Sequence, residues 1–321
     1  MAFLTAPVRV RVPASSANLG PGFDSLGLAL TLYDDVTARV TDGGVRVTVR
    51  GEGAEDLPTD GSHLIVATMN SAFDRIGGRP AGIELFCDNH IPHARGLGSS
   101  SAAVVAGILL ARALVEEGAA LLDDFAVMRL AAEIEGHPDN VAPTLLGGFT
   151  IAWTTRPARG HGGTRAVRLE ALEGLRPVIF VPSQLGFTAA ARAALPPTVP
   201  HADAAFNAAR TALLVHGLTQ DPRLLFDATE DRLHQDYRAP AMPETAKLLA
   251  TLREEGIAAV VSGSGPTVLA LVADDEHLLA EAENLCPEGW WSRSLDVASE
   301  GARILSVEHA EGDPVAAGLP G

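Results

Sequence analysis

The sequence predicts an α+β fold in which helices pack against antiparallel-rich sheets. Segments that alternate apolar and polar residues, as half-buried strands do, occur in both halves of the chain. Helical segments lie between and after them without the strict strand–helix alternation of a parallel α/β protein. The length of 321 residues favours about two domains, and 47% hydrophobic with 20% charged residues is typical of a globular chain.

The first half opens with a strand in "PVRVRVPAS", where apolar residues recur with period two. The same alternation flanks Asp42-Gly43-Gly44 and predicts a β-hairpin. "HLIVATMNSAFDRIGG" predicts a helix closed by glycines, and "AGIELFCDNHIP" predicts another strand. Two further helices are expected, an alanine-rich one after a glycine–serine cluster and one in "DDFAVMRLAAEIEG". A strand in "LLGGFTIAWTT" then leads out of this region.

The second half predicts strands in "RAVRLEAL", "RPVIFVPS" and "AAVVSGSGPTVLALVA", with helices between and after them. The Gly- and Arg-rich segment "RPARGHGGTRA" reads as irregular, so a domain boundary is placed there. The expected division is an N-terminal domain of residues 1–155, a C-terminal domain of residues 156–308 and a mobile tail of residues 309–321.

The charge pattern excludes several functions. Asp and Glu number 40 against 24 Lys and Arg, a net charge of −16, so neither nucleic acid nor an anionic membrane is expected as a partner. Lys247 is the single lysine, and it lies in an amphipathic helical stretch where we expect it to be solvated. A Walker-A loop, a protein kinase and a Schiff-base enzyme each need a placed lysine. Backbone N–H groups, a metal ion or arginine must therefore neutralise any bound phosphate.

The cysteines and the N-terminus indicate a cytoplasmic protein. Cys87 and Cys286 lack metal-ligand spacing and are interpreted as small buried hydrophobic residues in a reducing compartment. The opening "MAFLTAPVRVRV" has no apolar signal core. The longest apolar run, Ala102 to Ala111, is too short to span a bilayer.

Three glycine-rich stretches are candidates for chemistry, and each has a plainer alternative. "RGLGSSSAA", residues 95–103, is either an ordinary helix cap or a phosphate cradle at a helix N-terminus. "VPASSANLGPGFDSLGLAL", residues 12–30, places an amide and a carboxylate among small residues, more than a structural loop requires. "SGSGPTVLAL", residues 262–271, is either a turn between strands or a glycine loop that faces the first domain.

Together with "EGHPDNVAPTLLGGF", residues 135–149, these stretches resemble the motifs of the GHMP kinases, and within that superfamily those of the homoserine kinases. The resemblance runs in order from about residue 8 to about residue 272. It implies a GHMP kinase fold of two α/β-sandwich domains, the N-terminal one ribosomal S5-like and the C-terminal one ferredoxin-like. It also implies transfer of the γ-phosphoryl group of ATP to the side-chain hydroxyl of L-homoserine, a step towards threonine.

The resemblance implies where ATP and Mg²⁺ bind. By this resemblance Ser100 and a glutamate hold Mg²⁺, a cation that prefers oxygen ligands. Glu133 and Glu135 are both candidates, and Glu135 is favoured because it adjoins "GHPDN". The chain departs from the family at His63, where relatives often carry asparagine in a stretch that lines the adenine pocket. The expected ATP contacts are Pro92, His93, Ala94, Arg95, Gly96, Leu97, Gly98, Ser99, Ser100, Ser101 and His63.

The resemblance also implies the residues that bind the amino-acid substrate. The planar guanidinium group of arginine suits bidentate binding of a carboxylate, and Arg192 and Arg238 are the candidates. Arg232 lies nearby in sequence but is interpreted as a cation on a helix surface. The expected substrate contacts are Asn18, Asp24, His137, Asn140, Arg192 and Arg238, with Asn140, Asp24 and Arg192 as catalytic residues. Asp24 and Asp139 are the carboxylates that are candidates for a base, although the homoserine branch is thought to rely on positioning.

Two rival functions remain at this stage. One is a GHMP kinase for another small alcohol such as mevalonate, which has no ammonium group for Asp24 to meet. The other is a non-catalytic nucleotide or amino-acid sensor. Degenerate kinases usually lose phosphate-loop or metal residues, and this chain has Gly96, Gly98, Ser99, Ser100 and Glu135. The family resemblance further suggests a homodimer.

Overall fold

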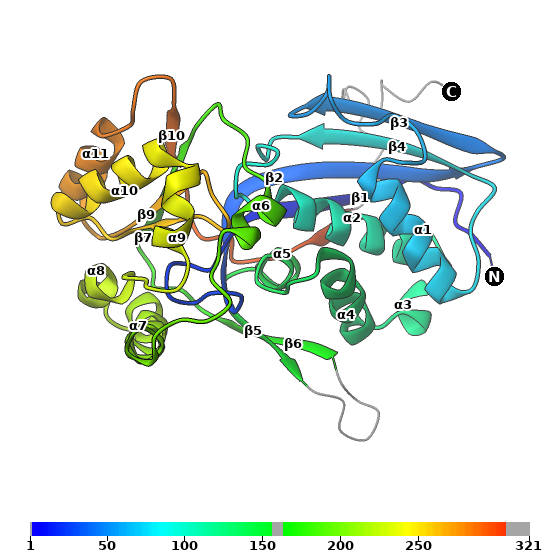
Figure 1. The fold of residues 1–321 in the computed structure, drawn as a ribbon. Coiled ribbons are helices and arrows are strands. Elements are labelled where there is room, and N and C mark those ends of the chain that lie inside the picture. The colour runs from blue at the N-terminus through cyan, green and yellow to red at the C-terminus, as the bar shows by residue number, and fades with distance from the viewer. Residues whose placement is uncertain (1, 156–162, 306–321) are drawn as a thin grey trace.

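The computed structural model describes residues 2–155 and 163–305, which form two sheets with helices packed on them (Figure 1). The first sheet contains β1 (Val8–Ala17), β2 (Leu26–Thr41), β3 (Gly44–Gly51), β4 (Gly82–Asn89), β5 (Phe149–Thr155), β6 (Gly163–Leu169) and β11 (Arg303–Leu305). The second contains β7 (Leu175–Val181), β8 (Ala259–Val261), β9 (Val268–Ala273) and β10 (Trp291–Ser294). The predicted α+β class is confirmed.

Helices cover one face of the first sheet (Figure 1). They are α1 (Leu64–Ile76), α2 (Ser99–Ala113), α3 (Gly118–Leu121), α4 (Asp124–Glu135) and α5 (Val141–Leu146). The alanine-rich α2 is buried along most of its length and packs on α1. Gly107 allows this contact, because a Cβ there would lie 2.8 Å from the carbonyl oxygen of Ile65. The predicted helix thus places its N-terminus firmly against the body of the protein.

The remaining helices lie in the part of the molecule that contains the second sheet (Figure 1). They are α6 (Thr188–Ala193), α7 (His201–Thr219), α8 (Leu225–Ala228), α9 (Gln235–Arg238), α10 (Pro243–Glu254) and α11 (Glu276–Asn284), with short 3₁₀ turns η1 (Pro222–Leu224) and η2 (Ala239–Ala241). Val178 and Phe180 of β7 pack with Leu248 and Leu252 of α10 in a core of their own. Lys247 is exposed on α10, as predicted.

The predicted hairpin at Asp42-Gly43-Gly44 is wrong. The sheet order is β11-β1-β2-β4-β3, so β4 lies between the two strands that the turn joins. β2 pairs with β4 in antiparallel fashion, and β3 pairs with β4 in parallel. A turn dipeptide reports only local backbone geometry, whereas the choice of neighbour depends on the return of the chain through α1.

The segment between β1 and β2 is a tight loop with left-handed backbone conformations. Asn18, Leu19 and Asp24 have φ angles of 66°, 51° and 55°, and Gly20 has 76°. The Asn18 side chain secures the loop, because its Oδ1 accepts a hydrogen bond from the Asp24 N–H at 3.0 Å. Side chains of this loop therefore project from a rigid base.

The division of the chain at residue 156 stays a prediction, and the boundary residue and the tail 309–321 lie outside the described residues. Two strands beyond residue 156 join the first sheet: β6 pairs with β5, and β11 pairs with β1. Cys87 is buried as expected, while Cys286 is only partly buried, and both are free thiols.

Candidate active site

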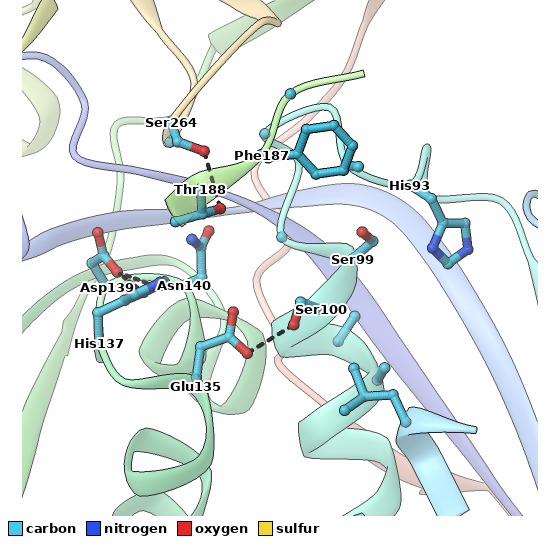
Figure 2. A pocket seen from close by; sticks show the side chains of 18 of the residues that line it. His93, Ser99, Ser100, Glu135, His137, Asp139, Asn140, Phe187, Thr188 and Ser264 are labelled. Atoms are coloured by element: carbon cyan, nitrogen blue, oxygen red, sulfur yellow. Dashed lines mark hydrogen bonds and ion pairs between the residues drawn. The ribbon is translucent and has the colours of Figure 1, made fainter. Parts of the chain in front are cut away.

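A cavity of about 410 Å³ brings together residues from all three glycine-rich stretches and from "EGHPDN". Figure 2 shows part of its lining, including Ser99, Ser100 and Ser264. Asn18 and Asp24 enter it from the β1–β2 loop, and Gly96, Gly98, Ser99 and Ser100 from the loop before α2 and the first turn of that helix. The segment after α4, the start of α6 and the turn after β8 complete the wall. The seven polar residues predicted from the motifs as substrate contacts or candidate bases all line this cavity: Asn18, Asp24, His137, Asp139, Asn140, Arg192 and Arg238.

The N-terminus of α2 opens towards the cavity. Its N-cap residue, Gly98, is left-handed with a φ of 71°, and no side chain caps the helix. No acidic residue lies within its first turn. The first N–H groups of a 15-residue helix are thus left for an anion, at the positive end of the helix dipole.

The predicted nucleotide contacts divide into two groups. Those that line the cavity are His63, His93, Ala94, Gly96, Gly98, Ser99 and Ser100. Those that do not are Pro92, Arg95, Leu97 and Ser101. Leu97 and Ser101 are fully buried. The Arg95 guanidinium donates to the carbonyl oxygens of His93, Pro182 and Ser183, so its side chain fastens the loop to the chain after β7.

Ser100 and Glu135 lie together at the N-terminus of α2. The Ser100 hydroxyl donates to Glu135 Oε2 at 3.0 Å, as Figure 2 shows. Glu133, the alternative candidate, instead forms an ion pair with Arg75 at 2.8 Å and lies away from the cavity. Two oxygen donors of the kind that Mg²⁺ prefers therefore meet at the start of α2.

Asp24 and Arg192 form a bidentate ion pair across the cavity. The Arg192 Nη1 and Nη2 atoms donate to the two carboxylate oxygens of Asp24 at 2.9 and 2.8 Å. The side chain of Arg192 is 45% exposed and that of Asp24 is 36% exposed, so a small molecule in solution can reach both. A negative and a positive group thus lie next to each other within reach of solvent, with the Arg192 guanidinium over the Phe23 ring at 5.6 Å from its centroid.

Arg238 supplies a second, more deeply buried positive charge. Its side chain donates to the carbonyl oxygens of Ala191 and Gly263 and to His234 Nδ1. Burial, followed by the nearby Arg192, lowers the pKa of Arg238 from its usual value. Arginine nevertheless stays charged at neutral pH.

Asn140 connects β1 with the start of α2. Its Oδ1 accepts from the Ser15 hydroxyl at 2.9 Å. A Cβ on Gly98 would lie 2.1 Å from this hydroxyl and 3.2 Å from Asn140 Oδ1, so the three groups are in close contact. The Asn140 amide is therefore held beside the start of α2 (Figure 2).

His137, which is partly buried, and the buried Asp139 form a pair on the same wall. His137 Nδ1 lies 2.8 Å from Asp139 Oδ1, which also accepts from the Asn140 N–H at 3.1 Å. The hydrogen bond to Asp139 raises the pKa of His137, and burial partly opposes it. Asp139 orients His137 and Asn140 rather than presenting a free carboxylate.

The end of the cavity away from Arg192 is more apolar. Val12, Val36, Leu57 and Ile65 line it together with the polar residues Asp34, His63, Asn89 and His93. His63 caps α1, because its Nδ1 accepts from the Ile65 N–H at 3.3 Å. Burial lowers the pKa of His63, and nearby His93 adds to this effect.

Asp34 is the unusual charge at this end. Its Oδ1 accepts from the backbone N–H groups of His90 and Ile91 at 2.6 and 2.9 Å. Burial raises the pKa of Asp34 to about 6, and these hydrogen bonds only partly oppose the shift.

Sequence reasoning missed the segment that closes the cavity from above. The Gly186 N–H donates to the Ala94 carbonyl oxygen at 2.7 Å, and the Thr188 and Ser264 hydroxyls lie 3.2 Å apart (Figure 2). The side chain of Phe187 is 66% exposed beside them. Ser264 lies in the third glycine-rich stretch and Thr188 lies four residues before Arg192, so proximity to these motifs was the available signal.

Comparison with known proteins agrees with this architecture. The family described as GHMP kinases N terminal domain matches residues 63–148, and GHMP kinases C terminal matches residues 209–289. A mevalonate diphosphate decarboxylase from Staphylococcus aureus has the same fold, with a TM-score of 0.62 at 16% identity over 94% of this chain and 98% of its own. Fold and motifs together define a protein of the GHMP kinase class.

More similar relatives narrow the assignment. A homoserine kinase of Streptomyces avermitilis is 55% identical over 306 residues, 95% of this chain and 98% of the relative. One of Clavibacter michiganensis subsp. michiganensis is 49% identical over 305 residues, 94% and 95% of the two chains. A homoserine kinase crystal structure from Cytophaga hutchinsonii matches with a TM-score of 0.79 at 26% identity, over 95% of this chain and all of its own. The chain belongs to the homoserine kinase family.

Within the part of the chain that the structure describes, no helix has the length and apolar character needed to cross a membrane.

Proposed function

We propose that the protein transfers the γ-phosphoryl group of ATP to the side-chain hydroxyl of L-homoserine, which gives O-phospho-L-homoserine and ADP. One observation carries the choice of substrate. The carboxylate of Asp24 and the guanidinium groups of Arg192 and Arg238 share one cavity with the free N-terminus of α2. A zwitterionic amino acid with a reactive hydroxyl matches this set of charges.

ATP occupies the cavity with its triphosphate at the start of α2. Gly96 and Gly98 present backbone N–H groups without side chains in the way, and Ser99 adds a hydroxyl. The base lies at the more apolar end, among Leu57, Ile65 and the histidines His63 and His93. The absence of a phosphate-loop lysine is thereby offset by the helix N-terminus.

The donor set suits Mg²⁺ bound jointly by protein and nucleotide. Within residues 2–155 and 163–305, no group of three or more His, Cys, Asp or Glu side chains has the geometry of a metal site. Ser100 and Glu135 would hold the ion from one side, which is the small protein share typical of Mg²⁺ sites that also use phosphate oxygens. When bound, the ion neutralises charge on the transferred phosphoryl group.

L-Homoserine binds between Asp24 and Arg192 and breaks the ion pair that they form with each other. Its ammonium binds Asp24, with Asn18 holding the loop, and its carboxylate binds Arg192 and Arg238. Asn140 and His137 then direct the side-chain hydroxyl towards the γ-phosphorus. The hydroxyl oxygen forms the new P–O bond as the bond to the bridging oxygen of ADP breaks, and one proton is released overall.

Catalysis rests on alignment rather than on a strong base. In the substrate complex Asp24 binds the ammonium group, and Asp139 accepts hydrogen bonds from His137 and from the Asn140 backbone. Phosphoryl transfer depends mainly on positioning and on neutralising charge, so this arrangement suffices.

The product identifies the reaction. Phosphorus NMR of the purified protein with ATP, Mg²⁺ and L-homoserine should show a new phosphomonoester signal together with ADP. Phosphate and ADP alone would indicate ATP hydrolysis, and an unchanged ATP spectrum would favour the sensor. A cytoplasmic location and a homodimer stay predictions.

A further inference from the structure

His234 is a buried histidine that lies outside the cavity but touches two parts of the site. It precedes α9, and its side chain is fully inaccessible to solvent. Nε2 lies 2.8 Å from the carbonyl oxygen of Gly20, in the β1–β2 loop. Nδ1 lies 3.0 Å from Nη1 of Arg238, four residues further along the chain.

These two partners determine the tautomer of the ring. A carbonyl oxygen only accepts hydrogen bonds, so Nε2 carries the proton. A guanidinium only donates, so Nδ1 keeps its lone pair. His234 is therefore neutral in this arrangement. Burial lowers its pKa, although the carboxylate of Asp231, with Oδ2 3.7 Å from Nε2, opposes this shift.

The two contacts belong to a closed ring of hydrogen bonds. Asn18, two residues before Gly20, donates from Nδ2 to the Gly263 carbonyl oxygen at 2.7 Å. Arg238 donates to the same oxygen at 3.3 Å. The loop that carries Asn18 and Asp24 and the Arg238 guanidinium are thus joined twice, through Gly263 and through His234.

The remaining contacts of Arg238 show what this ring achieves. Nη1 is engaged by His234 and Gly263, and Nε donates to the Ala191 carbonyl oxygen at 3.2 Å. Within the described part of the chain, Nη2 has no hydrogen-bond partner, and Arg238 lines the cavity. The guanidinium is held by two nitrogens while the third is left for an anion.

We infer that His234 is a positioning residue for substrate binding: its neutral ring sets the distance between the Arg238 guanidinium and the loop that carries Asn18 and Asp24. This inference rests on the proposed binding of the homoserine carboxylate by Arg238. His234 does not contact either substrate. It keeps Arg238, which binds the carboxylate, at the distance from Asp24, which binds the ammonium, that a single amino acid can bridge.

Three substitutions separate its two contacts. His234→Leu removes both, His234→Gln keeps a donor for Gly20 and loses the acceptor for Arg238, and His234→Asn keeps an oxygen near Nδ1. Loss of a hydrogen bond to a charged group leads us to expect that His234→Leu raises KM for L-homoserine about tenfold, with a smaller fall in kcat. KM for ATP should stay within about twofold. His234→Asn should lie closer to wild type than His234→Gln does.

A double-mutant cycle with Arg238→Ala distinguishes positioning from general damage. If His234 acts through Arg238, adding His234→Leu to Arg238→Ala should change KM for L-homoserine by less than about twofold. Thr229→Val supplies the matched control, because its buried hydroxyl binds Arg253 and carbonyl oxygens of α8 outside the cavity. This control should lower the melting temperature and leave KM for L-homoserine unchanged.

Additive effects in the cycle, equal losses for both substrates, or equal KM values for the Gln and Asn variants would each overturn the inference. If His234→Leu does not fold, the comparison of Gln with Asn decides. Unchanged KM for L-homoserine in Arg238→Ala alone would instead contradict the proposed carboxylate site, which is a different failure.

Discussion

Arg192 and Asp24 lie 168 residues apart in sequence and form two parallel hydrogen bonds across the mouth of the cavity. A substrate that carries both charges replaces the ion pair within the protein by two ion pairs with the substrate, one at Asp24 and one at Arg192. The pair thus keeps the opposite charges in place before the amino acid arrives, although an exposed ion pair itself adds little stability.

Substitution of Arg192 tests that exchange. We expect Arg192→Ala to raise KM for L-homoserine at least about tenfold, because a charge-assisted bidentate contact is lost. KM for ATP should change little, and the free energy of unfolding by less than about 1 kcal/mol. Arg223, which forms a similar bidentate pair with Asp221 on the surface, provides the control variant Arg223→Ala. Equal KM changes for ATP and L-homoserine would contradict the assignment.

Gly96 should be intolerant of alanine. Its φ is +80°, and a Cβ would lie 2.3 Å from the Ser262 carbonyl oxygen and 2.9 Å from that of Gly265. Gly136 has a similar φ of +88° but no atom within 4 Å of a Cβ, so Gly136→Ala carries the backbone strain alone. We expect Gly136→Ala to cost about 1 kcal/mol of unfolding free energy, and Gly96→Ala to cost more and to raise KM for ATP. Urea unfolding measures the free energy of unfolding of the two variants, and steady-state kinetics measures their KM for ATP. Equal values for Gly96→Ala and Gly136→Ala would show that the close contact of Gly96 with Ser262 and Gly265 is not required.

Glu135 and Glu133 should differ in their effect on metal dependence. We expect Glu135→Gln to raise the Mg²⁺ concentration for half-maximal rate by about tenfold or more, because an ionised oxygen ligand is lost. Glu133→Gln removes an exposed pair with Arg75 and should leave the Mg²⁺ titration unchanged. The reverse ranking would place the metal on the other face of α4.

Asp34 should make the protein less stable as pH rises. The folded protein holds the proton of Asp34 up to a pKa of about 6, whereas the usual value is 3.8. The unfolded chain therefore loses this proton first, and stability falls between about pH 4 and pH 6. Asp34→Asn keeps an oxygen for His90 and Ile91 and should gain up to about 3 kcal/mol at pH 7, but nothing at pH 4. Urea unfolding across this range is the measurement, and Asp42→Asn in the exposed turn after β2 is its control. A gain that does not vary with pH would contradict the raised pKa.

Sequence and structure agree best where chemistry is local. The phosphate loop, the residues around His137 and the loop of Asn18 and Asp24 are contiguous segments whose residue types indicate their role. Glu135 and Glu133 are two residues apart, so they point to different sides of α4. Only the structure shows that one meets Ser100 and the other Arg75.

Long-range partners could not be predicted in this way. β4 separates β2 from β3 although a turn signal joins them, because the sheet is completed through α1. Arg95 looks like a phosphate ligand within its motif, yet its guanidinium binds carbonyl oxygens of a segment about 87 residues later. The role of His234 is equally hidden, since its partner Gly20 lies 214 residues away.

Coupled ADP release with ATP and Mg²⁺ would show which alcohol the protein phosphorylates, with L-homoserine compared against D-homoserine, L-threonine and mevalonate. We expect turnover of L-homoserine in clear preference to the others, since Asp24 can bind the ammonium group and Arg192 and Arg238 the carboxylate of an amino acid whose primary hydroxyl reaches the γ-phosphate. Turnover of mevalonate with L-homoserine ignored would contradict it, as would ATP binding without ADP release for any of the four.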